Sequence, residues 1–593
     1  MNIKKRNFDL LTAAFFLFAV VILINDFFIV DIAITDKTRL GSIWPELFFN
    51  SLADATLLMA PCWVIKHRRT YTFIILWLAT LWSVAQLLYY PTYRDVMPFS
   101  SFLLVQNVSG TLIKSTLGAV TKKTLFLLLL PLALHCYNWF VLRRRETDSK
   151  PKRHWWMLLL SIVVFVVIRL TITTCIFLTY RSHYSSLEDT FKTYYSTLGG
   201  RHLNYVKHNG VMSYAFYCFL SNFNSKVSDE DIKRAQGFMS QQCPTYTDNS
   251  FATSIDRPNL IFIMVESLNA WAVNLKIDGQ EVTPTLNALA ADTANIVCLN
   301  VITQAKNGRS SDGKFMYQTG LLPLLDKSVA MEFGDRTFPS ITRALKKRGY
   351  QSVEICGDEG GLWNVETMSQ SYGFDTLMHQ SELFDQLEAN DWHSDKVIME
   401  QAVQYLPKLR KNFVAQLFTG VMHSPYNDVF KPATWISSSK QYTPSVRNYL
   451  EKTHYFDTQL AAFLDNMKKC GLYDKCVFVI ASDHSEPVDD DPKGRPALSR
   501  NGDECVLIVL NAKQGALIKG PVGQIDVYPT ILDVMGLNDY TWKGLGHSLL
   551  RNDISSVAIS PDEVRGNSAL LPSQRQAWDI SNILIRANWF KKK

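Results

Sequence analysis

Long apolar runs in the first 180 residues constrain this 593-residue chain more than any other feature of its sequence. A membrane-spanning helix needs about 20 mostly apolar residues. Five runs qualify as spanning helices: about 9–30, 44–65, 71–91, 124–142 and 156–179. Glu46, Asn50 and Asp54 interrupt the second run, so we expect this helix to pack inside a bundle or to begin later. The first run ends without a small-residue cleavage site, which favours a spanning helix over a signal peptide.

Basic residues assign the orientation of these spans. They cluster before the first run, between the second and third, and between the fourth and fifth: Lys4, Lys5, Arg6, Lys66, Arg68, Arg69, Arg143, Arg144, Arg145, Lys150, Lys152 and Arg153. With five spans these three regions share one side, which the positive-inside rule makes cytoplasmic. The rest of the chain after about Tyr180 then lies outside the cytoplasm. The net charge of +7 is therefore explained by membrane topology, and we expect no nucleic-acid partner.

The pattern of the sequence changes twice after the last run, which predicts three regions. Residues 1–180 form a transmembrane domain, 181–255 a linker and 256–593 an exported globular domain. The linker is polar and aromatic, with a helical pattern at 228–240. Its tyrosines and phenylalanines suit helices at the membrane surface, although ordinary packing explains them equally well.

The globular domain alternates short apolar runs with helical patterns. Strands are expected at 259–265, 296–302, 350–356, 413–418, 477–481 and 506–510. Helices are expected at 283–291, 339–348, 395–409, 449–469 and 527–535. This alternation predicts an α/β domain with a mostly parallel sheet and helices on both faces. Ligands of such sheets bind beyond the carboxyl ends of the strands.

Chemically capable side chains fall at those strand ends. Glu266 follows the first strand, and Asp483 and His484 follow the strand VFVIAS. Ser310 stands in SSDG, after a loop that follows another strand, and Ser311 is an adjacent alternative. Taken singly, such residues are more often caps or surface groups. Together they form a donor set for one divalent ion, which could activate a serine hydroxyl as a nucleophile.

These residues also resemble a known family. MVES, GRSSDGKF and ASDH resemble motifs of the alkaline-phosphatase superfamily, in particular its membrane-anchored lipoteichoic acid synthase and phosphoglycerol transferase branch, to which phosphoethanolamine transferases are related. The resemblance extends in order through GYQSVEICGDEGGLWN, SYGFD, DWHSD, HSPY and QIDVYPTILDVMG. It implies five N-terminal spans followed by a sulfatase-like domain with an alkaline-phosphatase-like fold.

The resemblance also implies roles for individual residues. The implied metal ligands are Glu266, Ser310, Asp483 and His484, with Ser310 also the nucleophile. The implied ion is manganese or zinc, with magnesium as a further option. His423, in VMHSPY, and Trp363, in LWN, are implied to line the pocket for the substrate headgroup.

The chain departs from the family pattern beside the nucleophile and in the headgroup pocket. Ser310 stands where lipoteichoic acid synthases mostly have threonine, which preserves the hydroxyl. Cys356 replaces a histidine and Val365 an arginine that contact the phosphoglycerol headgroup, so glycerol specificity is left open. Arg309 and Lys314 could supply positive charge instead, or could equally be solvated.

The same region argues against a formylglycine sulfatase. Such an enzyme needs proline or alanine two residues after the modified residue and arginine four residues after it. Asp312 and Lys314 occupy those positions here. The cysteines form no zinc-type cluster, although Cys470 and Cys476 could form a disulfide if their compartment is oxidising.

The resemblance implies a metal-dependent transferase in a bacterial cytoplasmic membrane. It would move a phosphoglycerol or phosphoethanolamine headgroup from a membrane phospholipid, through a covalent phospho-Ser310, to an extracytoplasmic glycan or lipid. One alternative is a phosphodiesterase, phosphatase or sulfatase-type hydrolase of the same superfamily. A second is a domain that only binds a partner, which the presence of all four candidate ligands disfavours.

Overall fold

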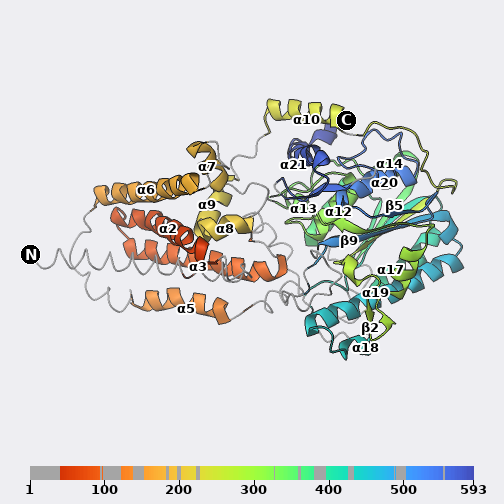
Figure 1. The fold of residues 1–593 in the computed structure, drawn as a ribbon, viewed down its shortest axis with the longest axis horizontal. Coiled ribbons are helices and arrows are strands. Elements are labelled where there is room, and N and C mark those ends of the chain that lie inside the picture. The colour runs from red at the N-terminus through yellow and green to blue at the C-terminus, as the bar shows by residue number, and fades with distance from the viewer. Residues whose placement is uncertain are drawn as a thin grey trace, which may run out of the picture. The chain divides into compact units, whose positions relative to one another are not determined.

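The computed structural model describes most of the globular domain and part of the membrane region (Figure 1). Described are residues 24, 40–93, 96–97, 120, 122–137, 153–179, 181, 186–195, 202–221 and 227–592, the last range with gaps at 243, 326, 358–361, 380–394, 425, 427–432, 487, 489–502, 552–554 and 562. The chain divides into two compact units between Ser225 and Lys226. The sequence analysis placed the end of the membrane domain earlier, at residue 180.

The described part of the first unit consists of helices and short connections between them. Its helices are α2 (Leu40–Met59, continued by a 3-10 turn at Ala60–Trp63), α3 (Arg68–Tyr93), α5 (Lys122–Tyr137), α6 (Trp155–Thr179), α7 (Leu187–Tyr194), α8 (His202–Asn209) and α9 (Val211–Ser221). Four predicted apolar runs therefore coincide with helices, while the run at 9–30 lies almost wholly outside the described residues. Within the described part, Thr70–Tyr89 and Trp155–Thr179 are long and apolar enough to cross a membrane. The five-span arrangement stays a prediction.

A buried polar network explains why polar residues interrupt the second apolar run. Asn50 and Asp54, four residues apart, share a face of α2. Arg169 of α6 donates to Asn50 Oδ1 at 2.7 Å and forms an ion pair with Asp54. Arg169 also donates to Ser213 Oγ of α9 at 2.7 Å. This helix therefore packs its polar face against other helices of its unit, one of the two outcomes expected from the sequence.

Part of the predicted linker also packs in this unit. Tyr205 and Tyr214, from α8 and α9, are buried in one apolar cluster with Trp82 of α3. The indole Nε1 of Trp82 donates to the Val211 carbonyl at 3.0 Å. The helix expected at 228–240 forms as α10 (Asp229–Gln242) and belongs to the second unit.

The second unit contains a sheet of nine described strands. They run in the order β10-β4-β9-β8-β1-β7-β5-β6, and β11 also pairs with β4. The strands are β1 (Asn259–Val265), β4 (Ile296–Ile302), β5 (Gln351–Cys356), β6 (Thr376–Met378), β7 (Phe413–Phe418), β8 (Cys476–Ser482), β9 (Glu504–Leu510), β10 (Ala516–Ile518) and β11 (Val522–Gly523). All six predicted strands are present. The sheet is mixed, because β9 runs antiparallel to β4 and β8, whereas the other pairs are parallel.

Helices cover both faces of this sheet. They are α11 (Pro284–Ala291), α12 (Ser310–Thr319), α14 (Ile341–Lys347), α15 (Val365–Tyr372), α17 (Asp395–Tyr405), α18 (Thr434–Ser437), α19 (Pro444–Lys469) and α20 (Val527–Val534), while α13 (Val329–Glu332) and α21 (Leu571–Arg586) pack in a further apolar cluster of this unit. Alternate residues of β1 enter opposite cores: Ile261 and Ile263 face one, Leu260 and Phe262 the other. A central strand buried on both faces must be apolar throughout, which is why β1 reads NLIFIMV.

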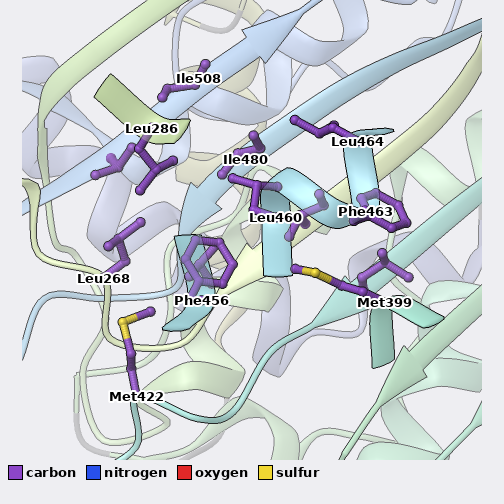
Figure 2. Close-up of a cluster of buried hydrophobic side chains, with 14 of the residues drawn as sticks. Leu268, Leu286, Met399, Met422, Phe456, Leu460, Phe463, Leu464, Ile480 and Ile508 are labelled. Carbon is purple, nitrogen blue, oxygen red and sulfur yellow. The ribbon is translucent and has the colours of Figure 1, made fainter. Parts of the chain in front are cut away.

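The longest described helix of this unit, α19, packs against one face of the sheet. Phe456, Leu460 and Phe463 of α19 recur at spacings of four and three, and pack with Ile480 of β8 and Ile508 of β9 (Figure 2). Burying each such side chain contributes about 1.5–3 kcal/mol. The helix begins at Pro444, five residues earlier than the sequence predicted, because the Thr443 side chain caps it by accepting from Val446 N.

The two cysteines considered for a disulfide are both free. Cys470 is exposed just after α19, and Cys476 is buried as the first residue of β8. They are therefore two separate thiols, without the disulfide that was considered from the sequence.

Candidate active site

Strand register brings the two predicted carboxylates together. In the parallel pair of β1 and β8, Val265 lies opposite Ser482. The next residue of each strand is therefore Glu266 and Asp483, and both side chains emerge at the same edge of the sheet. Asp483 N donates to the Val265 carbonyl at 3.1 Å, which extends the pairing into the site.

Helix α12 places Ser310 beside this pair of carboxylates. Ser310 is its first residue, and Oγ donates to Glu266 Oε2 at 3.0 Å and lies 3.3 Å from His484 Nε2. The preceding residue, Arg309, has φ = 45°, an unfavourable left-handed conformation at the point where the loop turns into the helix. Gly313 lets α12 approach β8, because a Cβ there would lie 2.1 Å from the Asp483 carbonyl oxygen.

The four predicted ligands thus converge. Ligand atoms of Glu266, Asp483 and His484 lie within 4.8 Å of one another, and all three residues are buried. His484 Nδ1 lies 3.0 Å from the Ser485 carbonyl, so it carries the proton and leaves the Nε2 lone pair toward the carboxylates. Nε2 is 3.5 Å from Asp483 Oδ2 and 3.8 Å from Glu266 Oε1. Burial and, after it, the charge of Arg309 lower the pKa of His484 to about 3, so the imidazole is neutral.

The charges of the cluster fit a divalent cation. Burial, and next the negative charge of Glu266, raises the pKa of Asp483 well above its usual value. Burial also opposes ionisation of Glu266, yet the neighbouring imidazoles and the Ser267 hydroxyl hold its pKa below the usual value. Within the described residues, Asp483 Oδ2 is buried without a hydrogen-bond partner. Carboxylates, a neutral imidazole and a hydroxyl are suitable ligands for such an ion.

Buried aspartates hold the loops that carry site residues, a role that the sequence analysis missed. Asp312 Oδ2 accepts from Lys306 N and Gly308 N, both at 2.9 Å, and fixes the loop before Ser310. Burial raises the pKa of Asp312 to about 7. Ser311 Oγ donates to the Gly308 carbonyl at 2.7 Å, so it engages this loop, whereas Ser310 contacts the cluster. The geometry favours Ser310 of the two candidates.

Three further residues support the carboxylates. Gln524 Nε2 donates to the Asp483 carbonyl at 2.7 Å. Thr419 Oγ1 accepts from Glu266 N at 3.2 Å, and Ser267 Oγ donates to Glu266 Oε1 at 2.6 Å. Gln524 and Ser267 stand in the motifs QIDVYP and MVES, but a motif alone does not separate a ligand from a residue that orients it.

The two predicted headgroup residues lie near the cluster. His423 is exposed in the loop after β7, and its charge acts on both Glu266 and His484. Asp395 Oδ1 accepts from Gly420 N at 2.9 Å and from Val421 N at 3.1 Å, which fixes this loop. Trp363 lines a small pocket together with Ser310.

The same pocket contains the two positions where the sequence departs from the motifs that it otherwise resembles. Cys356, at the end of β5, and Val365, at the start of α15, both line it. Lys314 lines it as well and forms a buried ion pair with Glu354. Arg309 forms an ion pair with Glu486. Neither of these two cations is simply solvated, which was one of the alternatives left open by the sequence.

A comparison with known protein families identifies the domain that contains this site. The family model for sulfatases matches residues 258–537, from β1 to just beyond α20, and this range includes all four clustered residues. Residues 258–537 are a sulfatase-family domain. Its mixed sheet and flanking helices form the α/β fold of alkaline-phosphatase-like proteins.

Relatives of this chain include lipoteichoic acid synthases. The chain is 28% identical over 364 residues to lipoteichoic acid synthase 2 of Bacillus subtilis, covering 57% of this chain and 55% of that protein. It is 27% identical over 378 residues to the lipoteichoic acid synthase of Staphylococcus aureus, covering 60% and 58%. The chain thus spans little more than half the length of these curated relatives.

A solved structure supports the fold of the sulfatase-family domain. A lipoteichoic acid synthase from Listeria monocytogenes aligns over 59% of this chain and 98% of its own, with a TM-score of 0.51 and 20% identity. At that identity the likeness concerns the fold.

Replacing Gly313 with alanine tests the close packing of α12 on β8. We expect Gly313→Ala to lower the free energy of unfolding by about 1–3 kcal/mol, because the new Cβ overlaps the Asp483 carbonyl. Gly237→Ala in α10, where a Cβ meets nothing within 4 Å, should stabilise the protein by about 0.5–1 kcal/mol. Thermal unfolding of the purified full-length variants in detergent measures both effects. Equal melting temperatures for the two variants would contradict the packing argument.

Proposed function

We propose that this protein is a membrane-anchored transferase that moves a phospholipid headgroup phosphate to an extracytoplasmic glycan or lipid. The observation that carries the proposal is the Ser310 hydroxyl, which contacts both Glu266 and His484 at the start of α12. The names of the relatives support it, since they are lipoteichoic acid synthases. A phosphoglycerol or phosphoethanolamine group is the proposed cargo.

In the first half of the proposed reaction, Ser310 Oγ attacks the phosphorus of the donor phospholipid. The Oγ–P bond forms, the P–O bond to diacylglycerol breaks, and the hydroxyl proton passes to solvent. The departing diacylglycerol oxygen needs a proton, which His423 can donate from its exposed position beside the cluster. Ser310 opens the ten-residue α12, so the helix N-terminus favours the negative charge of the phosphoryl group.

In the second half, a hydroxyl of the acceptor attacks the phospho-Ser310. A new P–O bond forms to the acceptor, the bond to Oγ breaks, and Ser310 regains its proton. The pocket beside Ser310 would hold the headgroup in both halves, with Trp363 as one wall. A divalent cation held by Glu266, Ser310, Asp483 and His484 would lower the pKa of the Ser310 hydroxyl and neutralise phosphoryl oxygens.

The nucleophile is tested with Ser310→Ala and the adjacent Ser311→Ala. Ser310→Ala should reduce release of diacylglycerol from phosphatidylglycerol or phosphatidylethanolamine vesicles by on the order of a thousandfold or more, because no covalent intermediate can form. Ser311→Ala should retain most activity, since the Ser311 hydroxyl donates to the Gly308 carbonyl of the preceding loop and not to the cluster.

Mass spectrometry of the wild-type protein after incubation identifies the group on Ser310. Undiminished turnover by Ser310→Ala would refute the mechanism. Free headgroup phosphate without any acceptor product would instead indicate a hydrolase.

The metal proposal predicts a single tightly bound divalent ion per chain. Asp483→Asn should weaken binding of manganese or zinc at least about tenfold, because it removes a charged ligand from the buried cluster. Asp465→Asn, on the exposed side of α19, is the matched control and should bind the ion normally. Elemental analysis after dialysis of the purified protein measures the bound metal. Equal metal content in Asp483→Asn and the control would exclude this site.

We also propose five spans, a cytoplasmic N-terminus and a sulfatase-family domain outside the cytoplasm. Cys470 reports the side of the membrane, because it is exposed in this domain. A membrane-impermeant maleimide added to intact bacterial cells should label Cys470, and Cys470→Ser should carry less label than the wild type. If labelling of Cys470 appears only after the membrane is permeabilised, the proposed orientation is wrong.

A further inference from the structure

The pocket beside Ser310 is mostly apolar, with one buried pair of charges in its wall. Trp363, Tyr372 and Phe418 supply aromatic surface. Among its lining residues, Lys314 and Glu354 carry charge, while the two serines, Trp363 and Tyr372 can also form hydrogen bonds. A headgroup that enters this pocket therefore meets an ion pair as the charged part of its wall.

The ion pair is built into the same elements that hold the nucleophile and the sheet edge. Lys314 follows Ser310 by four residues on α12, so both side chains share one face of the helix. Its Nζ bonds Glu354 Oε1 and lies 5.5 Å from the centre of the Tyr372 ring. The side chains of Lys314 and Glu354 are only 8% and 1% exposed.

The pair still has unused hydrogen-bonding capacity. Among the described residues, Glu354 Oε2 is buried and has no hydrogen-bond partner. An ammonium group has three N–H donors. Among the described residues, Lys314 donates to Glu354. The pocket thus offers donors from Lys314 and an acceptor from Glu354, while the pair as a whole is neutral.

We propose that the Lys314–Glu354 pair selects a neutral, hydroxylated headgroup, that of phosphatidylglycerol, over the ammonium headgroup of phosphatidylethanolamine. A hydroxyl both donates and accepts, so a glycerol diol can bond Lys314 and Glu354 together. An ammonium group only donates, so it cannot bond Lys314, and the neutral pair supplies no net negative charge to offset the cost of removing the ammonium group from water. The inference rests on the headgroup transfer proposed above and chooses between its two donors.

This role differs from the pattern that the family resemblance implies. The positions expected to hold a histidine and an arginine carry Cys356 and Val365, which provide neither positive charge nor a strong donor. The ion pair would take over the polar contact from α12 and from a neighbouring position of β5.

A second ion pair of the same domain offers a matched control. Lys327 and Glu332 are also a buried lysine–glutamate pair, 2.6 Å apart, with side chains 10% and 12% exposed. As in Glu354, one carboxylate oxygen of Glu332 is buried without a partner among the described residues. Neither residue lines the pocket beside Ser310. A purely structural role would make the two pairs respond alike.

The test compares Lys314→Gln with Lys327→Gln on vesicles that contain either phosphatidylglycerol or phosphatidylethanolamine. The measured quantity is the ratio of initial diacylglycerol release from the two lipids. The wild type and Lys327→Gln should prefer phosphatidylglycerol. Lys314→Gln should lose about tenfold or more of that preference, because it removes the charged donors for the diol and leaves the Glu354 carboxylate free to attract an ammonium group. A wild-type preference for phosphatidylethanolamine, or an unchanged ratio in Lys314→Gln, would overturn the inference.

A measurement on the wild type keeps the test valid if Lys314→Gln does not fold. Glycerol phosphate should raise the melting temperature of the full-length protein at concentrations where phosphoethanolamine does not. Equal or greater stabilisation by phosphoethanolamine would overturn the inference. Failure of the proposed function looks different: no headgroup would be transferred to Ser310 from either lipid.

Discussion

The parallel pairing of β1 with β8 forces two carboxylates into one buried position, and the rest of the site depends on that contact. Two like charges removed from water are costly unless hydrogen bonds and positive charge compensate them. Ser267 N and His484 N both donate to Asp483 Oδ1 at 2.7 Å. Among the described residues, no lysine or arginine forms an ion pair with Glu266 or Asp483. The fold therefore leaves buried negative charge that a bound cation would neutralise.

Two loops that are fixed by hydrogen bonds hold the side chains around these carboxylates in place. The loop before Ser310 and the loop before His423 are each tied by a buried aspartate that accepts from two backbone N–H groups, Asp312 and Asp395. Burial raises the pKa of each aspartate to about 7. Left-handed backbone at Arg309 persists only because such contacts over-determine it. The Ser310 hydroxyl is thus held against Glu266 and His484 without any substrate.

The sequence predicted the strands well because a central parallel strand must be apolar on both faces, and such runs are visible without any partner. Strand direction is not visible in this way: the run at 506–510 reads alike in either direction, so the antiparallel β9 was missed. Glu266, Asp483 and His484 were predictable because they follow strands that end at one edge. The pairing of Lys314 with Glu354 was not, because 40 residues separate them and both types are usually solvated.

Buried charge is satisfied differently at three places in this protein. Asp54 is matched by Arg169 within the helices of the first unit. Glu354 is likewise neutralised by Lys314, but this pair lies in a pocket wall beside Ser310. Each of these two carboxylates keeps one buried oxygen without a hydrogen-bond partner among the described residues, so the two pairs differ in their place rather than in their pairing. Among the described residues, Glu266 and Asp483 have no lysine or arginine in an ion pair, so more of their compensation is left for a bound group to provide.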